Sequence, residues 1–359
     1  MTASSSSPAR PARSPARPAR SPARPARILV TGGAGFIGSH YVRTLLGPAG
    51  PGDVAVTVLD KLTYAGNPAN LDEARDHPGF SFVRGDICDT GLVDELLAVH
   101  DQVVHFAAES HVDRSILGAD AFVRTNVLGT QTLLDAALRH SGDTRHGRPR
   151  TFVHISTDEV YGSIDSGSWP ETDPLRPNSP YAASKASADL IALAYHRTHG
   201  LDVRVTRCSN NYGHHHFPEK VIPLFVTNLL DGEKVPLYGD GGNVRDWLHI
   251  DDHVQGIELV RTKGRAGEVY NIGGGTELSN KELTALLLAA CGADWDTSVE
   301  YVPDRKGHDR RYSVDCGKAR AELGYEPRKD FATGLAETVT WYRENRAWWE
   351  PLKERAALR

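Results

Sequence analysis

Tyr181 and Lys185 are two residues whose types and spacing could do chemistry together. Residues four positions apart lie on one face of a helix, so this phenol and this ammonium can reach the same small molecule. The lysine charge is expected to lower the pKa of the tyrosine, and a tyrosinate can take a proton from a hydroxyl group. Thr157, at the end of an expected strand, can hold the same hydroxyl. A solvated helix face is the alternative, but the three side chains together predict oxidation of an alcohol.

Two adjacent carboxylates, Asp158 and Glu159, follow Thr157 directly. Oxidation of carbon 4 of a hexose to a ketone acidifies the proton on carbon 5, and a carboxylate can then remove it while an acid protonates the hydroxyl leaving carbon 6. We expect Glu159 to be the base and Asp158 the acid, which needs a raised pKa to stay protonated. The alternative is a pair of acids that accept backbone hydrogen bonds at a helix start. The pair predicts an elimination of water, with the hydride returned to carbon 6.

A glycine-rich segment at residues 32–38 follows the expected strand at 28–31 and opens a helix. Gly32 permits a tight turn, Gly35 lets backbone N–H groups approach a pyrophosphate, and Gly38 lets the helix pack closely. Asp60 ends the next strand, where a carboxylate accepts hydrogen bonds from ribose hydroxyls and repels a 2′-phosphate. These residues predict NAD rather than NADP, against the alternative of a purely structural turn.

The elements that must position these residues alternate between strands and helices, which predicts an α/β fold with a Rossmann-type, doubly wound parallel sheet. Strands are expected at residues 28–31, 54–59, 80–84, 103–106, 151–156 and 203–207, and helices at 36–46, 92–99, 119–139 and 180–199. Later helices are expected at 223–230, 280–290 and 331–345, with loops at 239–243 and 303–308. Strands and helices alternate less regularly in this later part of the chain, which predicts a smaller C-terminal substrate-binding domain.

This pattern predicts that the chain is divided into three parts. Residues 1–27 repeat Ser, Pro, Ala and Arg and are expected to form a disordered arm, since they have no apolar surface to bury. Residues 28–213 should form the NAD-binding domain, with returns near 250–272, and residues 214–359 should be mainly the substrate domain.

Composition excludes several classes of protein. The formal net charge is −5 although the arm contains six arginines and no acid, so the body of the chain is acidic and no nucleic-acid partner is expected. The four cysteines have no metal-site spacing, which predicts a reducing compartment without disulfides or zinc. No apolar stretch is long enough to cross a bilayer, so a cytoplasmic protein without membrane contact is expected.

On these motifs the sequence resembles the dTDP-glucose 4,6-dehydratase family of extended short-chain dehydrogenases/reductases, in particular members from actinomycete deoxysugar and antibiotic pathways. The resemblance covers residues 28–350, and the matching segments are 32–38, 60–67, 105–115, 156–162, 181–185, 207–213, 217–220, 245–247 and 304–311. It implies a hydro-lyase that converts dTDP-glucose to dTDP-4-keto-6-deoxyglucose and water, with tightly bound NAD recycled in each turnover. It also implies a homodimer formed through helices 119–139 and 180–199.

Site residues follow from the motifs and from the resemblance. The catalytic residues are expected to be Thr157, Asp158, Glu159, Tyr181 and Lys185. The residues expected to bind the cofactor are Gly32, Gly35, Phe36, Ile37, Gly38, Asp60, Lys61, Thr63, Asp86, Ile87, Phe106, Ala107, Ala108, Ser110, Thr125, Tyr181, Lys185 and Asn210. The residues expected to bind the substrate are Ser110, Thr157, Asn211, Lys220, Val221, Pro236, Tyr238, Arg245, Asn271, Arg305 and His308. Arginines and lysines in an acidic body suit a diphosphate.

The sequence departs from its relatives at the run His214-His215-His216 and at Lys306. Adjacent histidines rarely converge on one ion, so no metal is expected, and the loop is expected to adjust locally over the sugar. The nearest alternative function is another NAD-dependent nucleotide-sugar epimerase or decarboxylase. An alternative of a different class is a non-catalytic, NAD-sensing scaffold.

Overall fold

The computed structural model describes residues 25–141 and 151–357, and its central feature is a parallel sheet of seven strands in the order β10-β6-β5-β4-β1-β2-β3. The strands are β1 (Ala26–Thr31), β2 (Val54–Asp60), β3 (Phe80–Arg84), β4 (Gln102–His105), β5 (Thr151–Thr157), β6 (Asp202–Cys208) and β10 (Val269–Ile272). The order reverses beside β1, as in a Rossmann-type sheet. The six expected strands are all present, within two residues at each end.

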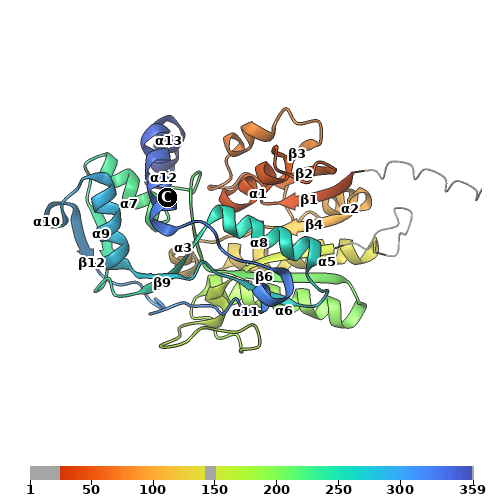
Figure 1. The fold of residues 1–359 in the computed structure, drawn as a ribbon. Coiled ribbons are helices and arrows are strands. Elements are labelled where there is room, and N and C mark those ends of the chain that lie inside the picture. Colours follow the sequence, from red (N-terminus) through yellow and green to blue (C-terminus); the bar gives the residue numbers. More distant parts are fainter. Residues whose placement is uncertain (1–24, 142–150, 358–359) are drawn as a thin grey trace, which may run out of the picture.

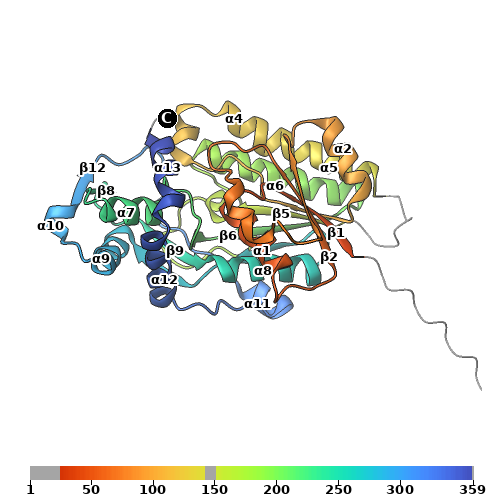
Figure 2. The same ribbon diagram turned by 90° about the horizontal axis from the view of Figure 1, so that it is seen from above.

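Both faces of the sheet are buried, and successive side chains of β1 therefore pack into different apolar cores. Ile28 and Val30 pack with one apolar cluster and Leu29 packs with the other. Helices α1 (Phe36–Leu46), α8 (Ile250–Lys263) and α11 (Gly317–Leu323) cover the first face. Helices α2 (Thr90–Val99), α5 (Thr130–Arg139) and α6 (Pro180–His199) cover the second face (Figure 2). We call this assembly the first lobe.

The boundaries of the first lobe differ from the prediction at its start. Ala26 and Arg27 pair with Val54 and Ala55 in the sheet, so the lobe begins before residue 28, and the expected arm was drawn two residues too long. The rest of that arm, residues 1–24, lies outside the described residues. The expected return near 250–272 is present as α8 and β10.

Most of the remaining elements form a second lobe with its own apolar core (Figure 1). Its strands are β7 (Asn210–Tyr212), β8 (Val235–Tyr238), β9 (Val244–His249), β11 (Thr276–Ser279) and β12 (Val299–Val302), paired as β11-β9-β7 and β12-β8. Its helices are α7 (Val221–Leu230), α9 (Asn280–Cys291), α10 (Trp295–Ser298), α12 (Phe331–Glu344) and α13 (Arg346–Ala357). Among the helices of the described ranges, none is long and apolar enough to span a membrane.

Helix α13 joins the two lobes and stands between them in both views (Figure 1, Figure 2). Its Trp348 Nε1 donates to Asn70 Oδ1 at 3.0 Å, in the 3-10 segment η1 (Pro68–Ala74) of the first lobe, and Asn70 Nδ2 donates to the Ala34 carbonyl at 3.0 Å. Lys353 Nζ donates to Asp231 Oδ2 at 2.7 Å, beside α7 of the second lobe. The C-terminal helix therefore ties the glycine-rich turn to the second lobe.

Candidate active site

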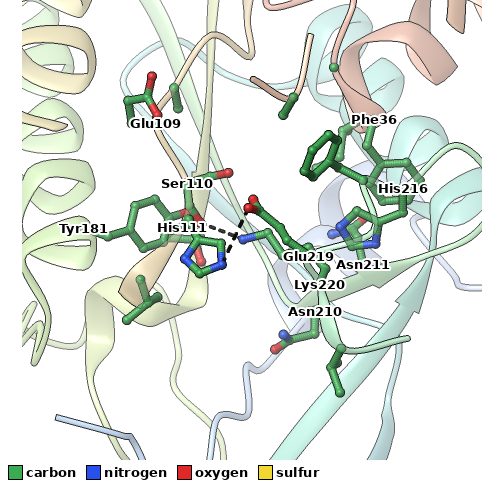
Figure 3. Close-up of a pocket in the computed structure, with 18 of the residues that line it drawn as sticks. Phe36, Glu109, Ser110, His111, Tyr181, Asn210, Asn211, His216, Glu219 and Lys220 are labelled. Atoms are coloured by element: carbon green, nitrogen blue, oxygen red, sulfur yellow. Dashed lines mark hydrogen bonds and ion pairs between the residues drawn. The ribbon is translucent and has the colours of Figure 1, made fainter. Parts of the chain in front are cut away.

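A cavity of about 890 Å³ lies between the lobes at the carboxyl ends of the strands. In open α/β sheets this is where ligands bind. All the residues expected in the site line it except Asn271. Figure 3 shows Tyr181 on one side of the cavity, Phe36 and His216 on the other, and Ser110 and Lys220 between them.

The glycine-rich turn is shaped by close backbone packing. A Cβ on Gly32 would lie 2.6 Å from the Ala107 nitrogen, and one on Gly38 would lie 2.4 Å from the Gly32 oxygen, so no side chain fits at either position. Asp60 accepts from the Ala34 backbone at 2.9 Å and from the Leu62 backbone at 2.7 Å. These bonds fix the carboxylate at the end of β2, facing the cavity.

Tyr181 and Lys185 lie on the buried face of α6, whose start is set by Ser179 Oγ accepting from the Ala182 backbone at 3.1 Å. Lys185 Nζ donates to the Ile155 carbonyl at 2.7 Å. Burial raises the pKa of Tyr181 well above 10, and the charge of Glu159 adds to the effect. Burial also lowers the pKa of Lys185 to about 8. The expected lowering of the tyrosine pKa is therefore not seen in the protein alone, where burial and the charge of Glu159 dominate.

Asp158 and Glu159 begin the 3-10 turn η4 (Asp158–Tyr161). Thr157 Oγ1 caps this turn by accepting from the Glu159 backbone at 3.3 Å, so neither carboxylate serves as the cap. Burial raises the pKa of Asp158 well above its usual range, with the charges of Glu159 and Asp246 adding to the effect. Burial also raises the pKa of Glu159, but the nearby Arg305 and Lys220 oppose it. The environments of the two carboxyl groups therefore favour Asp158 as the protonated member.

Three cations line the part of the cavity that faces the second lobe. Lys220 Nζ donates to the Ser110 carbonyl at 2.8 Å, Arg245 lies over the Tyr312 ring at 4.2 Å, and Arg305 lies 3.8 Å from Asp113. Tyr238 and His308 lie at the same end, with their rings 6.3 Å apart. This arrangement suits a diphosphate joined to a flat ring.

The expected substrate contact of Asn271 is wrong. This residue is fully buried in β10, its Oδ1 accepts from Tyr161 at 2.9 Å, and its Nδ2 donates to the carbonyls of Trp169 and Asp315. Asn280, the first residue of α9, lines the cavity instead. The start of this helix was expected at residue 280, and the capping box of Ser279 and Glu282 marks it, but its asparagine was not assigned to the site.

Other residues at the site were missed because only the tertiary structure brings them together. Glu219 accepts from Arg114 at 2.9 Å and lies 3.7 Å from His111, so it links the lobes beside Lys220. Tyr312 donates to Asp309 at 2.6 Å, and its hydroxyl lies 3.5 Å from Glu159 Oε2. No local spacing signals these contacts.

The three histidines have separate surroundings. His216 lines the cavity and stacks on Phe36 with ring centroids 4.1 Å apart. His214 Nδ1 and His215 Nδ1 are 2.6 Å apart, and His215 packs against Trp341 of α12 at 4.4 Å, away from the cavity. Within residues 25–141 and 151–357, no group of potential ligands is arranged to hold a metal ion.

Comparison with known proteins gives similarities across both lobes. The GDP-mannose 4,6 dehydratase family model matches residues 29–338. The dTDP-glucose 4,6-dehydratase of Streptomyces antibioticus is 68% identical over 333 residues, 92% of this chain and 96% of that protein. That of Streptomyces griseus is 68% identical over 331 residues, 92% of this chain and 98% of that protein. The structure of DesIV, a dTDP-glucose 4,6-dehydratase from Streptomyces venezuelae with NAD and TYD bound, has a TM-score of 0.87 and 64% identity, covering 91% of this chain and 99% of that one.

Buried histidines beside the site should make stability depend on pH. Burial lowers the pKa of His154 to about 4, and the charge of Lys185 adds to the effect. The unfolded chain binds this proton near pH 6.5 and the folded protein only near pH 4, so protonation favours unfolding in that window. This histidine should lower the free energy of unfolding by up to about 1.4 kcal/mol per pH unit as the pH falls from 6.5. Urea denaturation at a series of pH values measures the slope.

Two variants isolate the contribution of His154 to the pH dependence of the free energy of unfolding. His154→Gln should flatten the slope between pH 6.5 and 4 relative to the unmodified protein, because it removes one titrating group. His77→Gln, at an exposed position, should leave the slope unchanged. Equal slopes in His154→Gln and the unmodified protein would contradict the assignment.

Proposed function

Because the chain belongs to the dTDP-glucose 4,6-dehydratase family, we propose that it converts dTDP-glucose to dTDP-4-keto-6-deoxyglucose and water. The observation that carries the proposal is the adjacent pair of Asp158, which is buried, and Glu159, which is partly buried, beside Tyr181 in one cavity. Burial favours the protonated form of Asp158, and the cations near Glu159 favour its ionised form, which is the division of roles that an elimination needs.

The first lobe would hold NAD. Apart from the Gly32 oxygen at 3.3 Å, no heavy atom meets a Cβ built on Gly35, so backbone N–H groups can approach a pyrophosphate there. Asp60 would accept from the adenosine ribose, and Asp86 and Ile87 lie where adenine would rest. Bound NAD would supply the hydride acceptor for carbon 4 and the hydride donor for carbon 6, and its positive charge would offset the burial of Tyr181. The protein's own groups supply the remaining steps.

Thr157 and Tyr181 would orient the hydroxyl on carbon 4, and Tyr181 would take its proton. Lys185 is held by its hydrogen bond to the Ile155 carbonyl. When this lysine is protonated, it would place a positive charge beside Tyr181. Glu159 would remove the proton from carbon 5 of the resulting ketone. Asp158, the protonated carboxyl, would then give its proton to the hydroxyl leaving carbon 6.

The second lobe would hold the nucleotide. Lys220, Arg245 and Arg305 would neutralise the diphosphate, and the adjoining wall of Val221, Pro236 and Tyr238 would receive the base. An epimerase or decarboxylase would share the first hydride step but has no use for a protonated Asp158 beside Glu159. A non-catalytic scaffold is disfavoured because all five expected catalytic residues line one cavity.

The proposed activity predicts loss of one water from the sugar nucleotide. Purified protein mixed with dTDP-glucose, without added NAD, should give a product lighter by one water and no accumulation of reduced nicotinamide. Mass spectrometry and absorbance follow the two quantities. A product of unchanged mass would indicate an epimerase, loss of carbon dioxide from a uronic-acid substrate would indicate a decarboxylase, and no turnover with NAD added would overturn the proposal.

The two carboxyl groups predict a separation of oxidation from elimination. Glu159→Gln should still oxidise carbon 4, so that absorbance of reduced nicotinamide persists, while formation of free product slows at least about 100-fold. Asp158→Asn should also slow product formation, because it removes the acid. Glu300→Gln, at an exposed position in β12, is the control and should turn over normally. Product formation at the original rate by Glu159→Gln would contradict the assignment of Glu159 as the base.

We also propose that the chain forms a homodimer through an apolar patch of Leu117, Val123, Leu128 and Leu190, whose side chains are 49% to 89% exposed. The patch lies on α3 (Val112–Leu117), the π-helical segment η2 (Val123–Gly129) and α6, which pack together. This partly matches the helices expected to dimerise. Exposed apolar residues grouped in this way mark an interface.

Leu190→Asp should convert the dimer to a monomer, because two copies of a carboxylate would be buried at a symmetric interface. Size-exclusion chromatography with light scattering measures the mass. Leu286→Asp, an equally drastic change at a 42% exposed leucine of α9, should leave the dimer intact. A monomeric unmodified protein would contradict the proposed interface.

A cytoplasmic location is proposed on the state of the thiols. Cys88, Cys208, Cys291 and Cys316 are all free. Unpaired cysteines are typical of a reducing compartment.

A further inference from the structure

A chain of hydrogen bonds runs from helix α13 to Asp60 in the first lobe. Trp348 Nε1 donates to Asn70 Oδ1, and Asn70 Nδ2 donates to the Ala34 carbonyl, each at 3.0 Å. The backbone N–H of Ala34 then donates to Asp60 Oδ2 at 2.9 Å. Asp60 lines the cavity and the other three residues do not. The chain therefore connects the C-terminal helix to the glycine-rich turn and to the carboxylate at the end of β2.

The donors and acceptors of this chain allow only one orientation of the Asn70 amide. An indole N–H can only donate and a backbone carbonyl can only accept, so the amide oxygen faces Trp348 and the amide nitrogen faces Ala34. Asn70 is 3% exposed, so water has little access to replace either partner. The Ala34 carbonyl also accepts from the Asn67 backbone at 3.0 Å. The middle of the glycine-rich turn is thus held from the side of η1.

The last hydrogen bond of the chain acts on the carboxylate itself. Burial raises the pKa of Asp60, and the backbone hydrogen bonds from Leu62 and Ala34 oppose this effect. An ionised carboxylate is the form that accepts hydrogen bonds from two ribose hydroxyls. The position of Ala34 therefore affects both the place of Asp60 and its ability to accept.

The other end of the chain is held by the second lobe. The ring of Trp348 lies 5.0 Å from the Trp341 ring of α12 and 5.2 Å from the His215 ring. Further along α13, Lys353 Nζ donates to Asp231 Oδ2 and to Glu233 Oε2, each at 2.7 Å. The indole N–H is therefore presented to Asn70 by elements that do not belong to the first lobe.

We propose that Trp348 and Asn70 are positioning residues for NAD, because their hydrogen bonds hold the glycine-rich turn and Asp60 in the geometry that retains the dinucleotide. Both act through Ala34 and touch no ligand themselves. Docking of α13 on the first lobe and binding of NAD should then favour each other. This inference rests on the proposed function, because it concerns the cofactor of the same site.

A pair of matched variants tests the proposal. Trp348→Phe removes the indole N–H and keeps an aromatic ring. Trp295→Phe makes the same change in α10, at a partly buried ring that packs against the same apolar core of the second lobe. Exchange of bound NAD for isotope-labelled NAD should be roughly three- to tenfold faster in Trp348→Phe, which is the effect of one neutral hydrogen bond. Trp295→Phe should exchange NAD at the rate of the unmodified protein.

Two further readouts separate positioning from a general loosening of the protein. Asn70→Ala should also speed NAD exchange, and adding Trp348→Phe to it should give no further acceleration, because the chain is already broken. The affinity of NAD-saturated Trp348→Phe for dTDP, measured by calorimetry, should equal that of the unmodified protein, because the residues expected to hold dTDP lie at the other end of the cavity. Independent effects of the two substitutions on NAD exchange, or weaker dTDP binding, would overturn the proposal.

The unmodified protein provides a measurement that does not depend on a variant folding. Because coupling between two sites is reciprocal, removal of NAD should speed backbone hydrogen exchange in α13, over residues 346–357. Exchange in α10, which makes no part of the chain, should stay the same. Equal exchange of α13 with and without NAD would overturn the coupling.

The outcomes separate this inference from the proposed function. An unchanged rate of NAD exchange in Trp348→Phe, in a protein that turns over dTDP-glucose, overturns the inference alone. Faster NAD exchange in Trp348→Phe supports the inference even where the unmodified protein fails to turn over dTDP-glucose, and that failure overturns the function alone.

Discussion

Burial of ionisable side chains at the carboxyl ends of β5 and β6 is the constraint on which the rest of the site depends. A charge removed from water must be paired, hydrogen-bonded or neutralised. For Asp158 burial raises the pKa and so favours the neutral form, and Lys185 donates to the Ile155 carbonyl. The second lobe supplies Arg245 and Asp246, whose charges act on the pKa of Asp158 in opposite directions, so both lobes contribute to the acidity of this carboxyl group.

A buried chain of side chains outside the cavity holds the turn of Asp158 and Glu159 in place. Asp189, one helical turn beyond Lys185, pairs with Arg207 at 2.9 Å, and Arg207 donates to Tyr161 at 2.7 Å. Tyr161 ends the same 3-10 turn that begins with Asp158, and it donates in turn to Asn271. A fully buried ion pair of this kind contributes little net stability, but loss of either partner would leave a buried charge alone. Its role here is to fix η4 relative to α6.

Local patterns located the elements and motifs that depend on neighbours in sequence. The glycine-rich turn, the Tyr181–Lys185 face of α6 and the strand that ends in Thr157 were predicted because each is read within a few residues. Asn271 was assigned to the site wrongly because the position of a residue in the sequence does not predict which partners its side chain contacts. Its side chain is fully hydrogen-bonded to Tyr161 and to two backbone carbonyls. The pKa of Tyr181 was misjudged because burial is a property of the whole fold. Strands β7, β8, β9, β11 and β12 were missed because they lie where strands and helices alternate less regularly, and their pairings join segments far apart in the chain.

The bridge made by α13 has a consequence for how the molecule is assembled during translation. Trp348 and Asn70 are 278 residues apart, and the same helix brings Leu352 onto Tyr64 and Phe217. When the glycine-rich turn leaves the ribosome, most of the chain, including this cover, is still unmade. The glycine-rich turn therefore emerges uncovered by α13, and both the last strand of its sheet, β10, and this cover are added only from the C-terminal part of the chain.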